Sequence, residues 1–307
     1  MGGYVLKRVL FSVFVLWGAI TVVFIVLRLV PADPAQMILG SDATPAELAA
    51  LRAKLGLDQP LAVQYGTYLL DMLRGDFGTS FRLQQPAMEL VLERFPATAL
   101  LAVSALTLAV LVGVPLGVAA ALNPHRFIDR FVSFLSLMLQ SLPGFWVGIV
   151  LILVFARTLK LLPSAGNGTF AHLILPTVML ALPFIAVLTR MTRSGLLEVS
   201  HEGYIQTARA KGLPERVVIM PHAIRNALIP IVTIVGLQFG GLLGGAVITE
   251  TVFAWPGVGR MLVEAINQRD YNIVQAAILL ITGIFVVVNL LVDLLYAYLD
   301  PRVRLAS

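Results

Sequence analysis

The sequence predicts an all-α integral membrane protein with six transmembrane helices. Of its 307 residues, 58% are hydrophobic and 13% are charged, and the mean hydropathy is +0.90. This apolar content exceeds what the core of one soluble protein could bury. Six long intervals contain no Asp, Glu, Lys or Arg: 9–27, 95–125, 131–156, 161–189, 226–249 and 271–292. Each interval can form a helix that crosses about 30 Å of hydrocarbon, where a helix satisfies its own backbone hydrogen bonds.

Residues 1–29 are expected to hold an N-terminal segment and the first transmembrane helix. The apolar run 9–27 follows Lys7 and Arg8, as in a secretory signal, but it is longer than the roughly 7–15 residues of a signal peptide's apolar region. No small-residue cleavage site follows it, so we expect a retained helix.

The segment 30–93 is expected to lie outside the membrane with short helices of its own. Thr44, Pro45 and Glu47 form a capping-box pattern with proline at the first helical position, and Gly56 ends the apolar repeat that follows. A second amphipathic piece covers 63–72. The segment could be a lid packed on the membrane domain or a contact for an external partner, and the sequence supports both.

The remaining five transmembrane helices form a core over 94–298, followed by a tail at 299–307. Prolines inside these spans can kink a helix or leave it intact, and they are Pro115, Pro143, Pro176, Pro183 and Pro230. Where polar residues, proline and glycine coincide, we expect a bend that lines a cavity. The candidates for a translocation path are Gln140, Ser141 and Pro143 in the third span and Gln238 and Gly241 in the fifth.

The end of the core carries three further features. Glycines of the fifth span, including Gly240 and Gly244, allow another helix to approach closely, either for tight packing or for a sliding surface. The loop 250–260 combines turn residues with aromatics suited to the membrane interface, as in a simple anchor. Asp293 in the last span is a functional candidate, but we expect a structural residue that lies close enough to the inner surface to be satisfied there.

Basic residues predict the orientation. Six spans place both termini on one side, and assigning that side to the cytoplasm puts 12 of the 22 Lys and Arg residues in the inner loops and nine in longer outer segments. The net charge of +5 is divided among several short loops, which indicates orientation in a lipid membrane and not nucleic-acid binding.

The sequence contains no motif of a nucleotide-binding, catalytic or metal-binding site. None of its four lysines, Lys7, Lys54, Lys160 and Lys211, ends a phosphate-binding loop of the G-x-x-x-x-G-K-[ST] type, and no Gly-x-Ser-x-Gly occurs. There are no cysteines, and the four histidines have no metal-ligand spacing. We therefore expect no catalytic residue, no metal and no cofactor in this chain, which is then not an enzyme.

Ion-driven transport is a remoter alternative. Secondary transporters keep coupling carboxylates near the membrane midplane, whereas the acidic residues here fall outside five predicted spans and near the end of the sixth. A simple channel would leave the long polar segment 190–225 unexplained.

That polar segment contains a short predicted helix, about 202–213 with its stop. Gly212 is the expected C-terminal stop, and Pro214 prevents continuation. The helix could dock a soluble partner, or it could lie passively on anionic lipid. Its candidate docking residues are Tyr204, Gln206, Thr207, Ala208, Arg209, Ala210, Lys211 and Gly212, of which Tyr204, Thr207, Ala208 and Lys211 form one stripe.

Seven short motifs in order along the chain give this sequence a resemblance to a known family. They occupy 55–60, 75–78, 207–212, 225–227, 250–259, 269–271 and 300–302. The chain resembles the permease subunits of binding-protein-dependent ATP-binding-cassette (ABC) importers of the dipeptide, oligopeptide, nickel and glutathione family. The resemblance implies the type I ABC importer permease fold, with 204–212 as the coupling helix that enters a groove on the ATPase subunit.

One departure from the family pattern concerns the coupling helix itself. The general pattern is Glu-Ala-Ala, three residues and Gly; this chain has Gln206, Thr207 and Ala208 before Gly212, and Arg225 stands where proline is usual. The acidic contact of the first position is therefore not carried over, while the glycine is.

The resemblance also implies a heteromeric complex in the bacterial cytoplasmic (inner) membrane. Its partners would be a second, homologous permease subunit, two cytoplasmic ATP-binding subunits that hold ATP and Mg²⁺, and a periplasmic or lipid-anchored substrate-binding protein. The expected function is import of di- or oligopeptides, driven by the separate ATPases. Glutathione or chelated nickel is the alternative cargo on the same architecture.

Overall fold

The structure is a computed structural model, and it describes residues 2–29, 34–39, 43–54, 56–212 and 225–299. These residues are helical apart from short connections and one isolated bridge between Thr79 and Pro86. Four helices among them contain a stretch long and apolar enough to cross a membrane. They are α1 (Gly2–Leu29), α5 (Ala87–Leu122), α8 (Phe170–Ser200) and α13 (Tyr271–Leu299). The all-α membrane class is confirmed.

The third predicted span is broken where the sequence suggested a bend. Helices α6 (Phe127–Ser141) and α7 (Gly144–Leu151) meet at an angle of 100°, and α7 continues as the π-helical η1 (Ile152–Thr158). Leu142 is extended between them, and Pro143 has no backbone N–H to continue the helix. A bend was predicted at this point, and the structure shows that it divides the interval 131–156 between two helices.

The count of six spans remains a prediction. The bent pair raises the number of candidate spans to five over the residues that the structure describes. The predicted span 226–249 falls in α11 (Arg225–Val252), a 28-residue helix whose side chains are described only in part. The predicted tail 299–307 lies outside the described residues except for its first position.

Helix α8 starts later and ends later than the interval 161–189 that predicted it. The stretch before it contains Pro163 and Gly166, the latter with φ +96°, so no helix forms there. Thr169 and His172 then cap α8 reciprocally, with the Thr169 N–H donating to His172 Nδ1 over 3.1 Å. Pro176 and Pro183 stay inside the continuous helix.

Helices α5, α8 and α11 form the main core. Ala102, Ala105 and Ala109 of α5 are fully buried in it. Gly117 allows close approach, because a Cβ there would lie 2.6 Å from the carbonyl oxygen of Thr189 on α8. The absence of side chains therefore sets the separation of α5 and α8.

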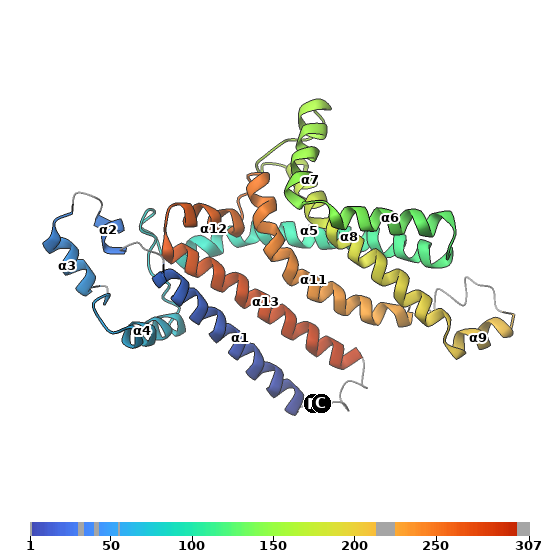
Figure 1. Cartoon of the computed structure of the whole chain (residues 1–307), viewed down its shortest axis with the longest axis horizontal. Helices are drawn as coiled ribbons and strands as arrows, with labels where there is room; N and C mark the ends of the chain where they lie inside the picture. Colours follow the sequence, from blue (N-terminus) through green and yellow to red (C-terminus); the bar gives the residue numbers. More distant parts are fainter. Residues whose placement is uncertain (1, 30–33, 40–42, 55, 213–224, 300–307) are drawn as a thin grey trace.

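Helices α1 and α13 lie side by side next to this core (Figure 1). Arg8 Nη1 of α1 lies 3.0 Å from Asp293 Oδ2 of α13, so Asp293 is paired, as a structural residue should be. Phe285 of α13 occupies the space left open by Gly240 of α11. This contact favours tight packing as the role of that glycine.

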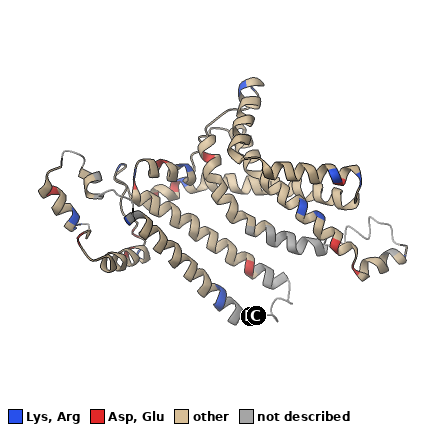
Figure 2. Ribbon diagram, in the orientation of Figure 1, with Lys and Arg blue, Asp and Glu red and all other residues tan. Residues whose placement is uncertain are grey.

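Apart from α7, the short helices are divided between the two ends of the long ones. Helices α2 (Pro34–Leu39), α3 (Pro45–Lys54), α4 (Leu61–Leu73) and α12 (Val258–Asn267) lie toward one end, and α9 (Gly203–Ala210) projects at the other (Figure 1). The predicted capping box is confirmed, because the Thr44 N–H donates to Glu47 Oε2 over 2.8 Å. Charged residues lie mostly toward the ends of the long helices (Figure 2).

The segment after α4 packs on the membrane helices, as the lid interpretation expects. Ser80 is fully buried, and its hydroxyl donates to Asp270 Oδ2 over 2.5 Å. Phe77 packs against the cluster formed by α5, α12 and α13. The alternative role as a contact for an external partner stays a prediction.

Candidate functional site

The predicted docking helix is present as α9, with its stop at Gly212. The Lys211 N–H donates to the Thr207 carbonyl over 3.1 Å, and Gly212 has φ +75°, a conformation that favours glycine. Within the helix, the Thr207 hydroxyl donates to the Gly203 carbonyl over 2.8 Å. The local sequence therefore specifies both the helix and its end.

One apolar side chain anchors α9 to the rest of the protein. Ile205 is fully buried and packs with Leu196 of α8 and with Val118 and Ala121 of α5. Ala208 packs partly against the same cluster. A short helix held by a buried isoleucine can transmit a push on its outer surface to α5 and α8.

Because Ile205 is buried against α5 and α8, the predicted docking residues of α9 differ in their exposure. Tyr204 is 45% exposed, and Gln206, Thr207, Ala210, Lys211 and Gly212 are exposed as well. Ala208 turns partly toward the protein, and the side chain of Arg209 lies outside the described residues. The exposed side of α9 is thus a surface of small and polar residues beside one aromatic ring, which is suited to contact with a protein groove.

An ion pair that the sequence did not reveal braces the helix that carries α9. Arg193 Nη2 of α8 donates to Asp129 Oδ2 of α6 over 2.9 Å, and Arg193 Nε donates to Asp129 Oδ1. The His125 N–H also donates to Asp129 Oδ2, over 2.9 Å. Asp129 is 4% exposed. The pair joins the start of α6 to α8 about two turns before α8 ends at Ser200.

A buried carboxylate organises the opposite end of the molecule. Glu250 is fully buried; its Oε1 accepts from the Thr98 hydroxyl over 2.6 Å, and its Oε2 accepts from the Arg260 N–H over 2.9 Å. Thr98 in turn accepts from the Val258 N–H over 2.8 Å. These bonds tie α5, the end of α11 and the start of α12 together.

The aromatics of the loop 250–260 are buried, which corrects the expectation of an interfacial anchor. Phe253 is 1% exposed and Trp255 is 3% exposed. The Trp255 indole N–H donates to the Ala97 carbonyl over 3.0 Å. The sequence did not reveal this burial, because the same pattern of aromatic and turn residues occurs both at membrane interfaces and in buried loops.

The candidate residues of the translocation path lie on two different elements. Gln140, Ser141 and Pro143 surround the break between α6 and α7 and are exposed, and the Ser141 hydroxyl donates to the Leu137 carbonyl over 2.9 Å. Gln238 and Gly241 lie on α11, where a Cβ on Gly241 would be 3.8 Å from the ring of Phe184. Their role in a path stays a prediction.

Over the described ranges, no group of three or more His, Asp or Glu side chains is placed to hold a metal ion.

Comparison with protein families gives two matches that together span most of the chain. Residues 1–102 match the N-terminal region of the membrane component of binding-protein-dependent transport systems. Residues 113–305 match the binding-protein-dependent transport system inner membrane component.

Individual relatives match over nearly the full length. The dipeptide transport system permease protein DppB of Alkalihalophilus pseudofirmus is 42% identical, with 99% of this chain and 100% of the relative covered. The glutathione transport system permease protein GsiC of Salmonella paratyphi A is 43% identical, with 99% of each chain covered. The probable peptide ABC transporter permease protein y4tP of Sinorhizobium fredii is also 43% identical, over 99% of this chain and 100% of the relative.

Two solved structures share the fold. A chain from inward-facing conformations of the MetNI methionine ABC transporter matches with a TM-score of 0.56 and 20% identity, covering 69% of this chain and 95% of that one. A chain of an amino acid ABC transporter matches with a TM-score of 0.52 and 18% identity, covering 70% of this chain and 94% of that one.

Proposed function

This chain belongs to the family of inner membrane components of binding-protein-dependent ABC transport systems, and on that premise we propose that it is the permease subunit of an ATP-driven importer of di- or oligopeptides. In such systems the ATPase activity resides in separate subunits, and a substrate-binding protein delivers the cargo. We further propose six spans with both termini in the cytoplasm, and a second, homologous permease subunit beside this one.

The observation that carries the proposal is the geometry of α9. Ile205 fixes the helix to α5 and α8, while the surface that includes Tyr204 and Thr207 remains exposed. We assign this surface to the groove of an ATPase subunit. Movement of the ATPases upon ATP binding would then pass through Ile205 and Leu196 into the long helices.

The energetic requirement supports a firm anchor. Shifting a two-state transporter from 1:99 to 99:1 requires about 5.5 kcal/mol of differential interaction. Burial of an isoleucine side chain contributes about 1.5–3 kcal/mol. The Asp129–Arg193 pair links α8 to α6 close to the contact with Ile205. We expect it to stiffen the part of α8 that receives the movement of α9.

The cargo is the finer part of the proposal. Relatives of nearly equal identity are named for dipeptide and glutathione transport, and both cargos are short peptides with a free amino group and free carboxylates. We propose di- or oligopeptide as the substrate class and glutathione as the alternative.

Uptake by the assembled importer in proteoliposomes tests the function. Labelled dipeptide should accumulate only with ATP and the binding protein, and uptake should survive collapse of the ion gradients. Uptake that follows an ion gradient without ATP would contradict the proposal. Competition between labelled dipeptide and glutathione distinguishes the two cargos.

A further inference from the structure

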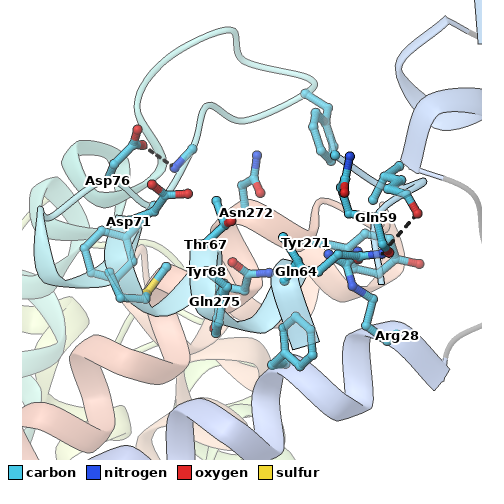
Figure 3. Close-up of a pocket in the computed structure, with 18 residues that line it drawn as sticks. Arg28, Gln59, Gln64, Thr67, Tyr68, Asp71, Asp76, Tyr271, Asn272 and Gln275 are labelled. Atoms are coloured by element: carbon cyan, nitrogen blue, oxygen red, sulfur yellow. Dashed lines mark hydrogen bonds between the residues drawn. The ribbon is translucent and has the colours of Figure 1, made fainter. Parts of the chain in front are cut away.

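A cavity of about 330 Å³ lies between the end of α1, helix α4, the loop after it and the start of α13. Figure 3 shows residues of these four segments pointing into it. Its volume is at the lower end of the range for small-ligand pockets. None of the residues discussed for coupling contributes to it.

The basic and acidic residues that line the cavity lie at opposite ends of it. Arg28 of α1 lies at one end of the view, whereas Asp71 and Asp76 lie at the other (Figure 3). Arg28 also lies over the ring of Phe24, 5.2 Å from its centroid. Among the described residues, Arg28 and Asp71 have no side-chain ion pair, so both charges are available to a ligand.

Between the charged ends, buried polar atoms lack hydrogen-bond partners within the described part of the chain. They are Gln64 Oε1, the Tyr68 hydroxyl and the Tyr271 hydroxyl. All three residues line the cavity. Buried polar groups in folded proteins are nearly always hydrogen-bonded, so the walls of this cavity contain three polar atoms with unused hydrogen-bonding capacity.

Two hydrogen bonds fix the orientation of the Gln64 side-chain amide. Its Nε2 donates to the Leu57 carbonyl over 3.0 Å and to the Gln59 carbonyl over 2.8 Å. Oε1 is therefore left as an acceptor. Burial raises the pKa of Tyr68 to about 12, so at neutral pH its hydroxyl is protonated and can donate to a ligand.

We propose that this cavity binds a small zwitterion, a short peptide with free termini, whose carboxylate pairs with Arg28 and whose ammonium group pairs with Asp71 and Asp76. Gln64, Tyr68 and Tyr271 hydrogen-bond the amide groups between the two charges. The assignment rests on the proposed function, because the proposed orientation places the cavity on the external side, where a binding protein releases its cargo. It deepens that function by adding a binding site on the permease itself.

The test uses the assembled importer in nanodiscs of phosphatidylglycerol, without binding protein and without ATP. Dialanine, N-acetyl-dialanine and dialanine amide are titrated calorimetrically. We expect dialanine to bind at least tenfold more tightly than either blocked form. Equal binding of the three compounds, or no binding of dialanine, overturns the proposal.

Variants assign each end of the ligand to its residue. Arg28→Gln should bind dialanine and its amide equally, and Arg28→Lys should restore part of the preference. Asp71→Asn should reduce the discrimination against N-acetyl-dialanine. Arg82→Gln is the matched control, because Arg82 is exposed in the adjoining loop and does not line the cavity; it should bind all three as the unaltered protein does.

Two further outcomes are distinguishable. The first concerns phosphatidylethanolamine, whose headgroup is also a zwitterion. Native mass spectrometry would show whether this lipid is retained by the protein and released in Arg28→Gln. If both are observed and dialanine does not compete with the lipid, the peptide assignment is overturned. ATP-driven uptake without charge-selective binding in the nanodiscs contradicts the cavity proposal alone. Selective binding without any ATP-driven uptake contradicts the proposed function alone.

Discussion

Arg193 of α8 donates to both carboxylate oxygens of Asp129 at the start of α6. The two residues are 64 positions apart, and the pair is a polar link between α6 and the segment of α8 that leads to α9. Loss of either partner leaves the other charge uncompensated. The cost is greater when Asp129 is the residue left unpaired, because Asp129 is almost fully buried and Arg193 is more exposed.

Arg193→Gln should therefore destabilise the protein by about 2 kcal/mol, somewhat below the roughly 3–5 kcal/mol for breaking a fully buried pair. The measurement is the thermal unfolding midpoint of the purified permease. Glu264→Gln is the matched control, since it removes the exposed Arg260–Glu264 pair and should change stability by less than about 1 kcal/mol. Equal shifts in the two variants would show that the buried pair has no special role.

Glu250→Ala should be more damaging than most substitutions at that end of the molecule. It leaves the Thr98 hydroxyl and the Arg260 N–H without their acceptor, and each unsatisfied buried group costs about 1–3 kcal/mol. Limited proteolysis should then cut the 253–257 loop, which is protected in the unaltered protein because Phe253 and Trp255 are buried. An unchanged cleavage pattern would contradict this account.

Gly117→Ala tests the close approach of α5 and α8. The added Cβ would lie 2.6 Å from Thr189 O and from Thr192 Cβ, and overpacking of this kind costs about 1–3 kcal/mol. Gly195→Ala on α8 is the control: a Cβ there meets nothing within 4 Å, and alanine favours a helix by about 1 kcal/mol over glycine. The unfolding midpoint should fall in the first variant and stay or rise in the second.

Tyr68 gives a pH-dependent prediction. Burial raises its pKa to about 12 in the folded protein, above the value of about 10 for an unfolded tyrosine. The folded state thus holds this proton more tightly, and its contribution to stability is complete below about pH 10 and falls as the pH rises toward 12. Ultraviolet titration of tyrosinate in the unaltered protein and in Tyr68→Phe should differ by one group titrating near pH 12; a difference centred near pH 10 would contradict the burial of this hydroxyl.

Local features could be predicted from sequence because adjacent residues determine them. The Thr44–Glu47 cap, the helix up to Lys211 and its stop at Gly212 all depend on neighbours within about four positions. The break at Pro143 was predicted for the same reason, although its 100° angle was not, because packing of the two pieces against other helices sets the angle.

Long-range relationships could not be predicted in this way. Thr98 and Glu250 are 152 positions apart, and Ser80 and Asp270 are 190 positions apart. Nothing in the local sequence of either partner identifies the other. Ile205 was likewise missed as the anchor of α9, because its burial depends on where α5 and α8 end in space.

Site-specific crosslinking tests whether the exposed surface of α9 contacts an ATPase subunit. The chain contains no cysteine, so Thr207→Cys carries a unique attachment point for a photo-crosslinker on the exposed side. Phe127→Cys, at the exposed start of α6 near the same end of the molecule (Figure 1), is the control. We predict a crosslink to the ATPase subunit from Thr207→Cys that strengthens or weakens with ATP, and little from the control. Absence of any ATPase crosslink from Thr207→Cys in an assembled, ATP-hydrolysing complex would contradict it.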